Sequence, residues 1–168
     1  EKALALAACE LGKLMGLKVI ACASSDEKLE FAKAHGAELT LNYAKEDLKE
    51  GLKRLTGGKG VDIVFDPVGG SYAEAALRAI AWEGRFLVIG FAAGDIPKMP
   101  LNLALLKGCD IRGVFWGAWT SLNPEKNRAN LEKLVKWTAE GKISSHVDRT
   151  FPLAQTADAL KVLAGRKA

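Results

Sequence analysis

Residues 18–34 read KVIACASSDEKLEFAKA, and this stretch decides the fold class. The run 18–23 is almost continuously apolar and of strand length, as expected of a parallel strand that is covered on both faces. Ser24, with Glu27 three residues later, matches a capping box and predicts a helix that ends at Ala34. The stretch therefore predicts a strand, a tight turn and a helix in direct succession.

The same alternation continues on both sides of this unit. Strands of 4–6 residues separated by helices indicate a parallel α/β sheet, because parallel neighbours need a crossover connection. The predicted strands are 38–41, 61–65, 85–89 and 111–116, and the predicted helices are 2–15, 45–55, 71–82, 101–106, 124–140 and 153–163. The segment 142–151 is expected to be extended.

Composition favours an ordinary globular protein. Of the 168 residues, 49% are hydrophobic and 26% charged, and the net charge of +4 is spread along the presumed helices. This composition argues against a disordered chain, and the spread of charge argues against a nucleic-acid-binding surface. No run approaches the roughly 18 apolar residues that a membrane helix needs, and no targeting signal is visible. We expect a cytoplasmic protein, with a mitochondrial location still open.

The cysteines and histidines give no pattern of metal ligation. Cys9, Cys22 and Cys109 are far apart in sequence and lack the spacing of a zinc site, so we expect buried, reduced thiols. His35 and His146 are expected to be isolated from each other and from the cysteines, as surface or cap residues. No metal site is predicted.

In a doubly wound sheet, ligands bind beyond the carboxyl ends of the strands. After the first visible strand, a NAD-selective protein usually carries Asp or Glu for the ribose hydroxyls, whereas this chain carries Ser24 and Ser25. Two hydroxyls at a helix N-terminus suit a 2′-phosphate, and Lys28 adds a positive charge. Alternatively, Ser24 is only a helix cap and Lys28 only an exposed helix residue.

Three further strand ends carry distinctive residues. The loops 66–70 and 90–94 contain glycines that let backbone amides approach a ligand, although each is also an ordinary turn. Phe115 and Trp116 form an aromatic cluster that serves either as core or as the wall for a flat ring. Asp66 is expected to shape its turn rather than to act in catalysis.

Taken in order, five motifs resemble quinone oxidoreductases of the zeta-crystallin type, in the medium-chain dehydrogenase/reductase superfamily. They are VIACASSDEK at 19–28, LNY at 41–43, GVDIVFDPVGG at 60–70, GRFLVIGFA at 84–92 and GVFWG at 113–117. The resemblance implies a Rossmann-like doubly wound parallel sheet that lacks its first strand. In the order 3-2-1-4-5-6 that strand is central, so its neighbours are expected to keep unpaired edges.

The resemblance also implies domain limits and site residues. Residues 1–141 correspond to a partial dinucleotide-binding domain and 142–168 to the return toward a catalytic domain, which makes the chain a fragment of a longer polypeptide. The expected cofactor is NADPH. The expected cofactor-binding residues are Ser24, Ser25, Lys28, Tyr43, Val68, Gly90, Phe91, Ala92, Phe115 and Trp116. Tyr43 and Val68 have structural alternatives, as a strand-end aromatic and as core.

By the same resemblance, the expected activity is zinc-independent hydride transfer from NADPH to a quinone or an α,β-unsaturated carbonyl. An enoyl-thioester reductase and a non-catalytic NADPH-binding or crystallin-like protein remain alternatives. No catalytic acid or nucleophile is identified. The family also implies a homodimer formed through the last strand of the sheet, at 111–115.

Overall fold

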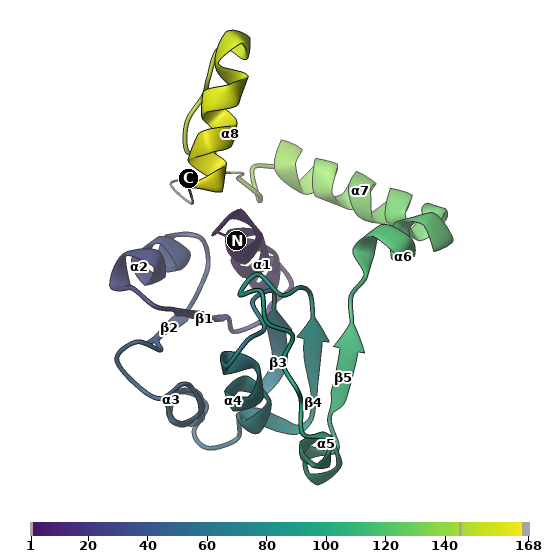
Figure 1. Ribbon diagram of the computed structural model, residues 1–168. Helices are drawn as coiled ribbons and strands as arrows, with labels where there is room; N and C mark the ends of the chain where they lie inside the picture. The colour runs from purple at the N-terminus through teal and green to yellow at the C-terminus, as the bar shows by residue number, and fades with distance from the viewer. Residues whose placement is uncertain (1, 145, 166–168) are drawn as a thin grey trace.

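The computed structural model describes residues 2–144 and 146–165 and has an α/β architecture (Figure 1). The strands are β1 (Ile20–Ala23), β2 (Leu39–Asn42), β3 (Val61–Asp66), β4 (Ile80–Val88) and β5 (Asp110–Gly113). The helices are α1 (Lys2–Leu14), α2 (Asp26–Ala34), α3 (Leu48–Leu55), α4 (Tyr72–Arg78), α5 (Leu101–Lys107), α6 (Trp116–Leu122), α7 (Pro124–Ala139) and α8 (Thr156–Ala164), the last preceded by a 3-10 turn, Leu153–Gln155.

All strand pairs are parallel, and they form two separate sheets. One sheet has the order β1-β2 and the other the order β3-β4-β5. In the described part of the chain, β1 and β3 pair on one side only. The expected doubly wound order without its central strand is therefore confirmed.

Two apolar clusters hold these layers together. The larger lies between α4, α5 and the three-stranded sheet, with Leu77, Ile80 and Phe86 almost fully buried. The second joins Leu41 of β2 and Leu52 of α3 to residues at the end of α4. The second cluster thus connects the β1-β2 sheet to the β3-β4-β5 sheet through side chains.

The helix expected at 71–82 is wrong over its last four residues, because α4 ends at Arg78 and the next residues join the sheet. Val61 N donates to Ala79 O over 3.0 Å, and Ile80 pairs with Val61 before the register shifts. Ile80 is fully buried, whereas Trp82 is 67% exposed. Strand pairing has overridden the local helix pattern here.

Three other expectations need correction. The cap of α2 is Ser25, whose backbone is extended and whose Oγ accepts the Lys28 N–H over a long 3.5 Å, so the Ser24 capping box does not form. The last strand ends at Gly113, and Trp116 begins a helix, α6, that was not expected. Residues 142–144 and 146–151 contain no strand, so they form no regular extended element.

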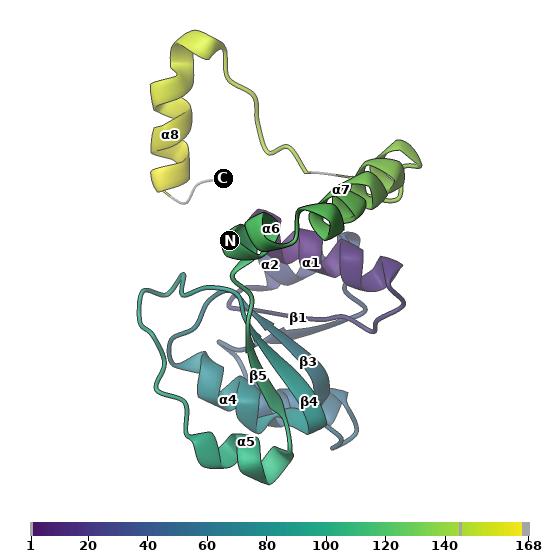
Figure 2. The ribbon, with the colours of Figure 1, turned by 90° about the vertical axis from the view of Figure 1, so that its right-hand side faces the viewer.

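The remaining predicted helices are confirmed, with shifts of a few residues at their ends. Pro124 occupies the first turn of α7, where its missing N–H costs no hydrogen bond. α6, α7 and α8 contain no buried residue within the described chain, and α8 stands apart from the rest in two perpendicular views (Figure 2). The domain limit at residue 141 stays a prediction.

Gly60 lies where β3 meets β4, and we expect the stability of the protein to depend on it. Its φ is +88°, and a Cβ there would lie 2.6 Å from Ala79 O. We expect Gly60→Ala to lower the free energy of unfolding by more than about 1 kcal/mol, because backbone strain and a backbone clash add. Urea unfolding of the protein expressed from its complete gene measures this.

The matched control is Gly57→Ala, where φ is also positive, at +62°, but no atom lies within 4 Å of the added Cβ. Gly57→Ala reports the backbone strain alone. Equal losses for the two variants would contradict the role given to the close approach between Gly60 and Ala79.

Candidate cofactor site

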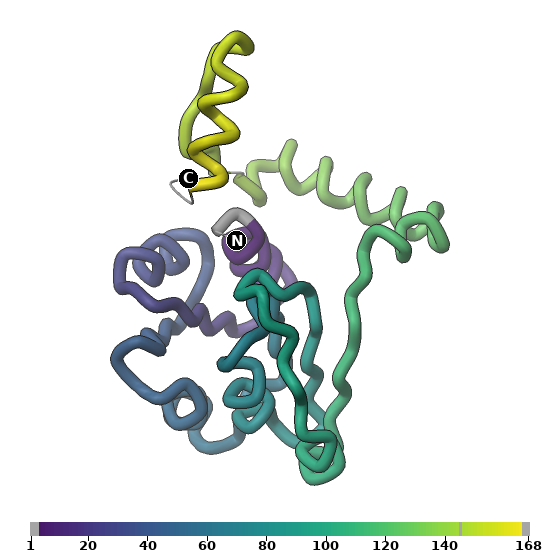
Figure 3. Tube along the Cα trace, in the orientation of Figure 1, coloured from purple at the N-terminus to yellow at the C-terminus, as the bar shows by residue number. Residues whose placement is uncertain are grey.

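The carboxyl ends of β4 and β5 border an open pocket of about 200 Å³. Among the expected site residues, Gly90, Phe91 and Phe115 meet there although β4 and β5 are separated by a long connection. That connection runs from the end of β4 back along the sheet to α5, the teal segment in Figure 3. The other lining residues are Val88, Ile89, Gly113 and Val114.

The pocket is small and mostly apolar, and its lining includes the aromatic residues Phe91 and Phe115. Its volume is below the roughly 300 Å³ typical of whole-ligand pockets, so it suits one ring of a larger molecule. Phe91 is 40% exposed and Phe115 81%. Phe115 is therefore not core, and neither is Trp116, which is 64% exposed, begins α6 and lies outside the pocket lining.

The loop after β3 is shaped by Asp66. Its carboxylate oxygen Oδ1 accepts the backbone N–H groups of Val68 and Gly69, both over 2.9 Å. Such a turn folds the backbone back on the strand end and occupies the carboxylate. The expected turn-shaping role of Asp66 is confirmed.

The loops after β3 and β4 are joined by backbone hydrogen bonds. Ala92 N donates to Pro67 O over 3.1 Å, and Ala93 N donates to Val68 O over 2.9 Å. A Cβ on Gly69, whose φ is +68°, would lie 2.9 Å from the Phe91 ring. Val68 is half-buried in this pair of loops, and Ala92 is held by its amide. The loops therefore form one wall beside the pocket.

The other expected residues lie at the ends of β1 and β2. Tyr43 N donates to Ala23 O over 3.1 Å, which places Tyr43 next to the turn that carries Ser24 and Ser25. Ser24 and Lys28 are exposed, and Ser25 is half-buried. The N-terminus of α2 is thus bordered by two hydroxyls and a lysine, a suitable environment for an anion.

Tyr43 also has a structural role. Its ring packs on Tyr72 of α4 with a centroid distance of 4.4 Å, and it contacts the apolar cluster between the sheets. The alternative that Tyr43 is a strand-end aromatic is therefore compatible with its position. Contact with a ligand through its hydroxyl is compatible as well, since the residue is only half-buried.

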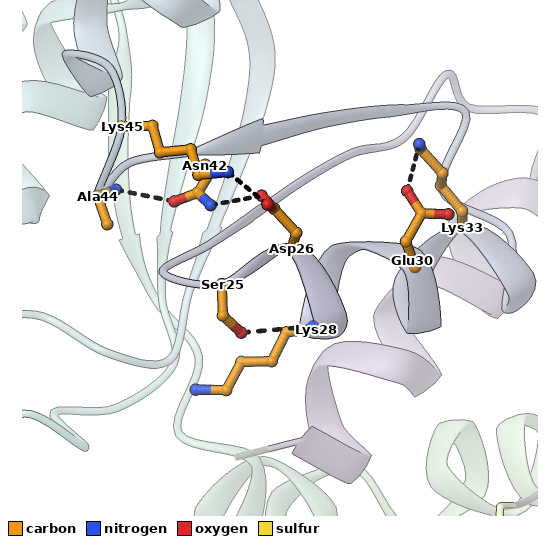
Figure 4. Close-up of polar contacts among 8 residues, drawn as sticks. All are labelled: Ser25, Asp26, Lys28, Glu30, Lys33, Asn42, Ala44 and Lys45. Carbon is orange, nitrogen blue, oxygen red and sulfur yellow. Dashed lines mark hydrogen bonds and ion pairs between the residues drawn. The ribbon is translucent and has the colours of Figure 1, made fainter.

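Sequence reasoning missed three residues beside this turn. Asp26, the first residue of α2, is bound by Asn42 and Lys45 (Figure 4). The Lys45 hydrogen bond, followed by the Asn42 hydrogen bond, holds the pKa of the Asp26 carboxyl below its usual value. The available signal was the position of Asn42 at the carboxyl end of a predicted strand, within the LNY motif.

The expectation that the two histidines are isolated from each other is wrong. His35 forms the C-cap of α2, as expected for a cap residue, and the ring of His146 lies 6.0 Å from it. Phe31 packs against both rings, at 4.4 Å and 4.8 Å. These contacts join segments more than a hundred residues apart, which local sequence could not indicate.

The expectation of three buried thiols also fails in part. Cys9 is buried, Cys109 is half-buried and Cys22 is exposed. Within the described residues, no three His, Cys, Asp or Glu side chains gather in a way that could hold a metal ion. No described helix has both the length and the apolar character for a membrane span.

Residues 3–139 match the family described as zinc-binding dehydrogenase. The chain belongs to this family. The resemblance seen in its motifs, to quinone oxidoreductases of the medium-chain dehydrogenase/reductase superfamily, is confirmed as well. The bovine quinone oxidoreductase-like protein 2 is 39% identical over 154 residues, which are 92% of this chain and 44% of the relative.

Solved structures support the same assignment. The Escherichia coli quinone oxidoreductase complexed with NADPH has a TM-score of 0.83 and 28% identity, over 97% of this chain and 51% of that one. The nucleotide-binding subdomain of the enoylreductase domain of PpsC from Mycobacterium tuberculosis has a TM-score of 0.68 and 25% identity, over 84% and 79%. The chain spans about half the length of the full-length quinone oxidoreductase relatives that it matches.

Asp66 should contribute to stability through its turn. We expect Asp66→Ala to lower the free energy of unfolding by about 1–3 kcal/mol, because two backbone N–H groups lose a charged acceptor. Asp66→Asn keeps one carbonyl acceptor at the same place and should lose less. Thermal unfolding of both variants tests this, and an unchanged Asp66→Ala would contradict the assigned role.

Proposed function

We propose that this chain is the NADPH-binding part of an oxidoreductase that transfers hydride to a quinone or an α,β-unsaturated carbonyl without zinc. The observation that carries the proposal is the pair of features at the strand ends. The turn directly after β1 carries Ser24 and Ser25 in place of an acid, and an apolar pocket lies at the ends of β4 and β5. The NADPH complex of the related Escherichia coli enzyme supports it.

The residues present fit the two ends of such a cofactor. Ser24, Ser25 and Lys28, with Tyr43 beside them, would bind the 2′-phosphate by hydrogen bonds and charge at the start of α2. Gly90 would let the backbone approach the ribose side closely, together with Val68 and Ala92 in the two joined loops. These assignments complete the adenosine and ribose parts of the proposal.

The pocket would receive the nicotinamide ring between Phe91 and Phe115, with Trp116 near its outer edge. Bound NADPH supplies the hydride, and the protein orients the ring and excludes water. The high exposure of Phe115 supports this use, because covering an exposed aromatic side chain with a flat ring buries apolar surface and favours binding. No side chain of this chain is assigned as a proton donor.

Cofactor preference is tested most directly by changing the charge at the start of α2. We expect Ser24→Asp to weaken NADPH binding by about tenfold, or about 1.4 kcal/mol, because its carboxylate repels the 2′-phosphate. NADH binding should stay the same or improve. Titration of the protein from its complete gene, followed by nicotinamide fluorescence, measures both affinities.

The matched control is Ser24→Asn, which has the size of Asp without its charge and should keep the NADPH preference. Equal weakening by Asn and Asp would point to a steric effect and count against the phosphate site. If the unmodified protein bound NADPH no better than NADH, the proposed cofactor preference would be wrong.

An enoyl-thioester reductase is a second candidate, supported by the likeness to the PpsC subdomain. Assays of NADPH oxidation with a quinone, an enone and an enoyl-CoA, in the presence and absence of a zinc chelator, separate the two. Turnover of the thioester alone would favour this candidate, and loss of activity with the chelator would refute zinc independence. Tight NADPH binding without turnover would favour a non-catalytic protein.

We also propose a homodimer through β5. This strand pairs with β4 on one side only, and all four of its residues are exposed. Such an edge is usually covered in a native protein. Light scattering of the protein from its complete gene should give twice the monomer mass, and a monomer would contradict the proposal.

A further inference from the structure

The contact among Asp26, Asn42 and Lys45 occupies both oxygens of one carboxylate. Asn42 Nδ2 donates to Asp26 Oδ1 over 2.7 Å, and the Lys45 ammonium pairs with Asp26 Oδ2. Asn42 is itself fixed, because it is only 9% exposed and its Oδ1 accepts the Ala44 N–H over 3.0 Å. The carboxylate is therefore held from the β2 side.

Asp26 lies where a free acid would matter. It follows the Ser25 cap directly and is the first residue of α2, beside the proposed phosphate site. An acid near the end of the second Rossmann strand selects cofactors with free ribose hydroxyls and disfavours a 2′-phosphate. In Figure 4 the Asp26 side chain points toward Asn42 and Lys45, while the Ser25 hydroxyl faces the backbone of Lys28.

Stability does not explain this arrangement well. The Asp26 side chain is 63% exposed and the Lys45 side chain 66%. Ion pairs at such exposed positions contribute little to folding, because water and salt screen them. The contact has a more specific consequence than stability, because it holds the negative charge of Asp26 on the side of Asn42 and Lys45.

We propose that Lys45, together with Asn42, is a positioning residue that determines cofactor specificity by engaging the Asp26 carboxylate and turning it away from the 2′-phosphate of NADPH. This inference rests on the proposed NADPH site. Lys45 acts through Asp26 and makes no contact with the cofactor. Removal of the Lys45 ammonium therefore changes the affinity for NADPH only when residue 26 carries a carboxylate.

The test compares single and double variants of the protein from its complete gene, with NADPH and NADH titrated in parallel. We expect Lys45→Met to weaken NADPH binding about fivefold, because the Asp26 charge is released next to the phosphate. NADH binding should be unchanged or tighter. Asp26→Asn combined with Lys45→Met should return the NADPH-to-NADH affinity ratio to that of the unmodified protein, and Lys45→Arg should keep it.

The control removes a different lysine, whose ion pair lies entirely within α2. Lys33 pairs with Glu30 over 2.7 Å in the last turn of α2, also shown in Figure 4. Lys33→Met makes the same change in net charge as Lys45→Met, away from the Ser25 turn. It should leave the affinity ratio unchanged.

Two results would overturn the inference while leaving the proposed function intact. If the double variant bound NADPH as weakly as Lys45→Met, Lys45 would contact the phosphate itself. If Lys45→Met weakened both cofactors equally, its role would be structural. A protein without NADPH preference before any substitution would instead refute the proposed cofactor site, and the inference with it.

Discussion

The structure depends on one small apolar cluster, formed by Leu41, Leu48, Leu52 and Ala79. Its members come from β2, from α3 and from the junction of α4 and β4. In the described chain the two sheets share no strand pairing, so side-chain burial must do what backbone hydrogen bonds do elsewhere. Together with the packing of Tyr43 on Tyr72, this cluster keeps the ends of β1 and β2 near those of β3 and β4.

This constraint explains how the candidate site is assembled. One half of the candidate site lies at the start of α2, which follows a strand of the two-stranded sheet. The other half is the apolar pocket at the end of the three-stranded sheet. Tyr43 reaches across by packing on Tyr72 of α4. A ligand that spans both halves would therefore bind across the junction that the cluster holds, which agrees with ligand binding at the carboxyl ends of parallel strands.

Charge at the start of α2 is arranged by contacts within the fold. Ser25 caps the helix, and Asp26 is drawn toward β2 by Asn42 and Lys45. The first turn of α2 carries two acids, Asp26 and Glu27, and these contacts hold the first of them on the β2 side. A count of charges along the segment would miss this, because the direction of the Asp26 side chain depends on residues 16 and 19 positions away.

Local sequence patterns were sufficient to predict the elements that form for local reasons. Apolar runs of strand length predicted the parallel strands, and the Asp66 turn followed from residues that lie next to one another. By contrast, packing in three dimensions determines that α4 stops at Arg78, that Asp26 faces Asn42, and that His35 lies close to His146. Each of these results from a contact between distant segments, whose free energy exceeds the local preference and leaves no trace in the spacing of neighbouring residues.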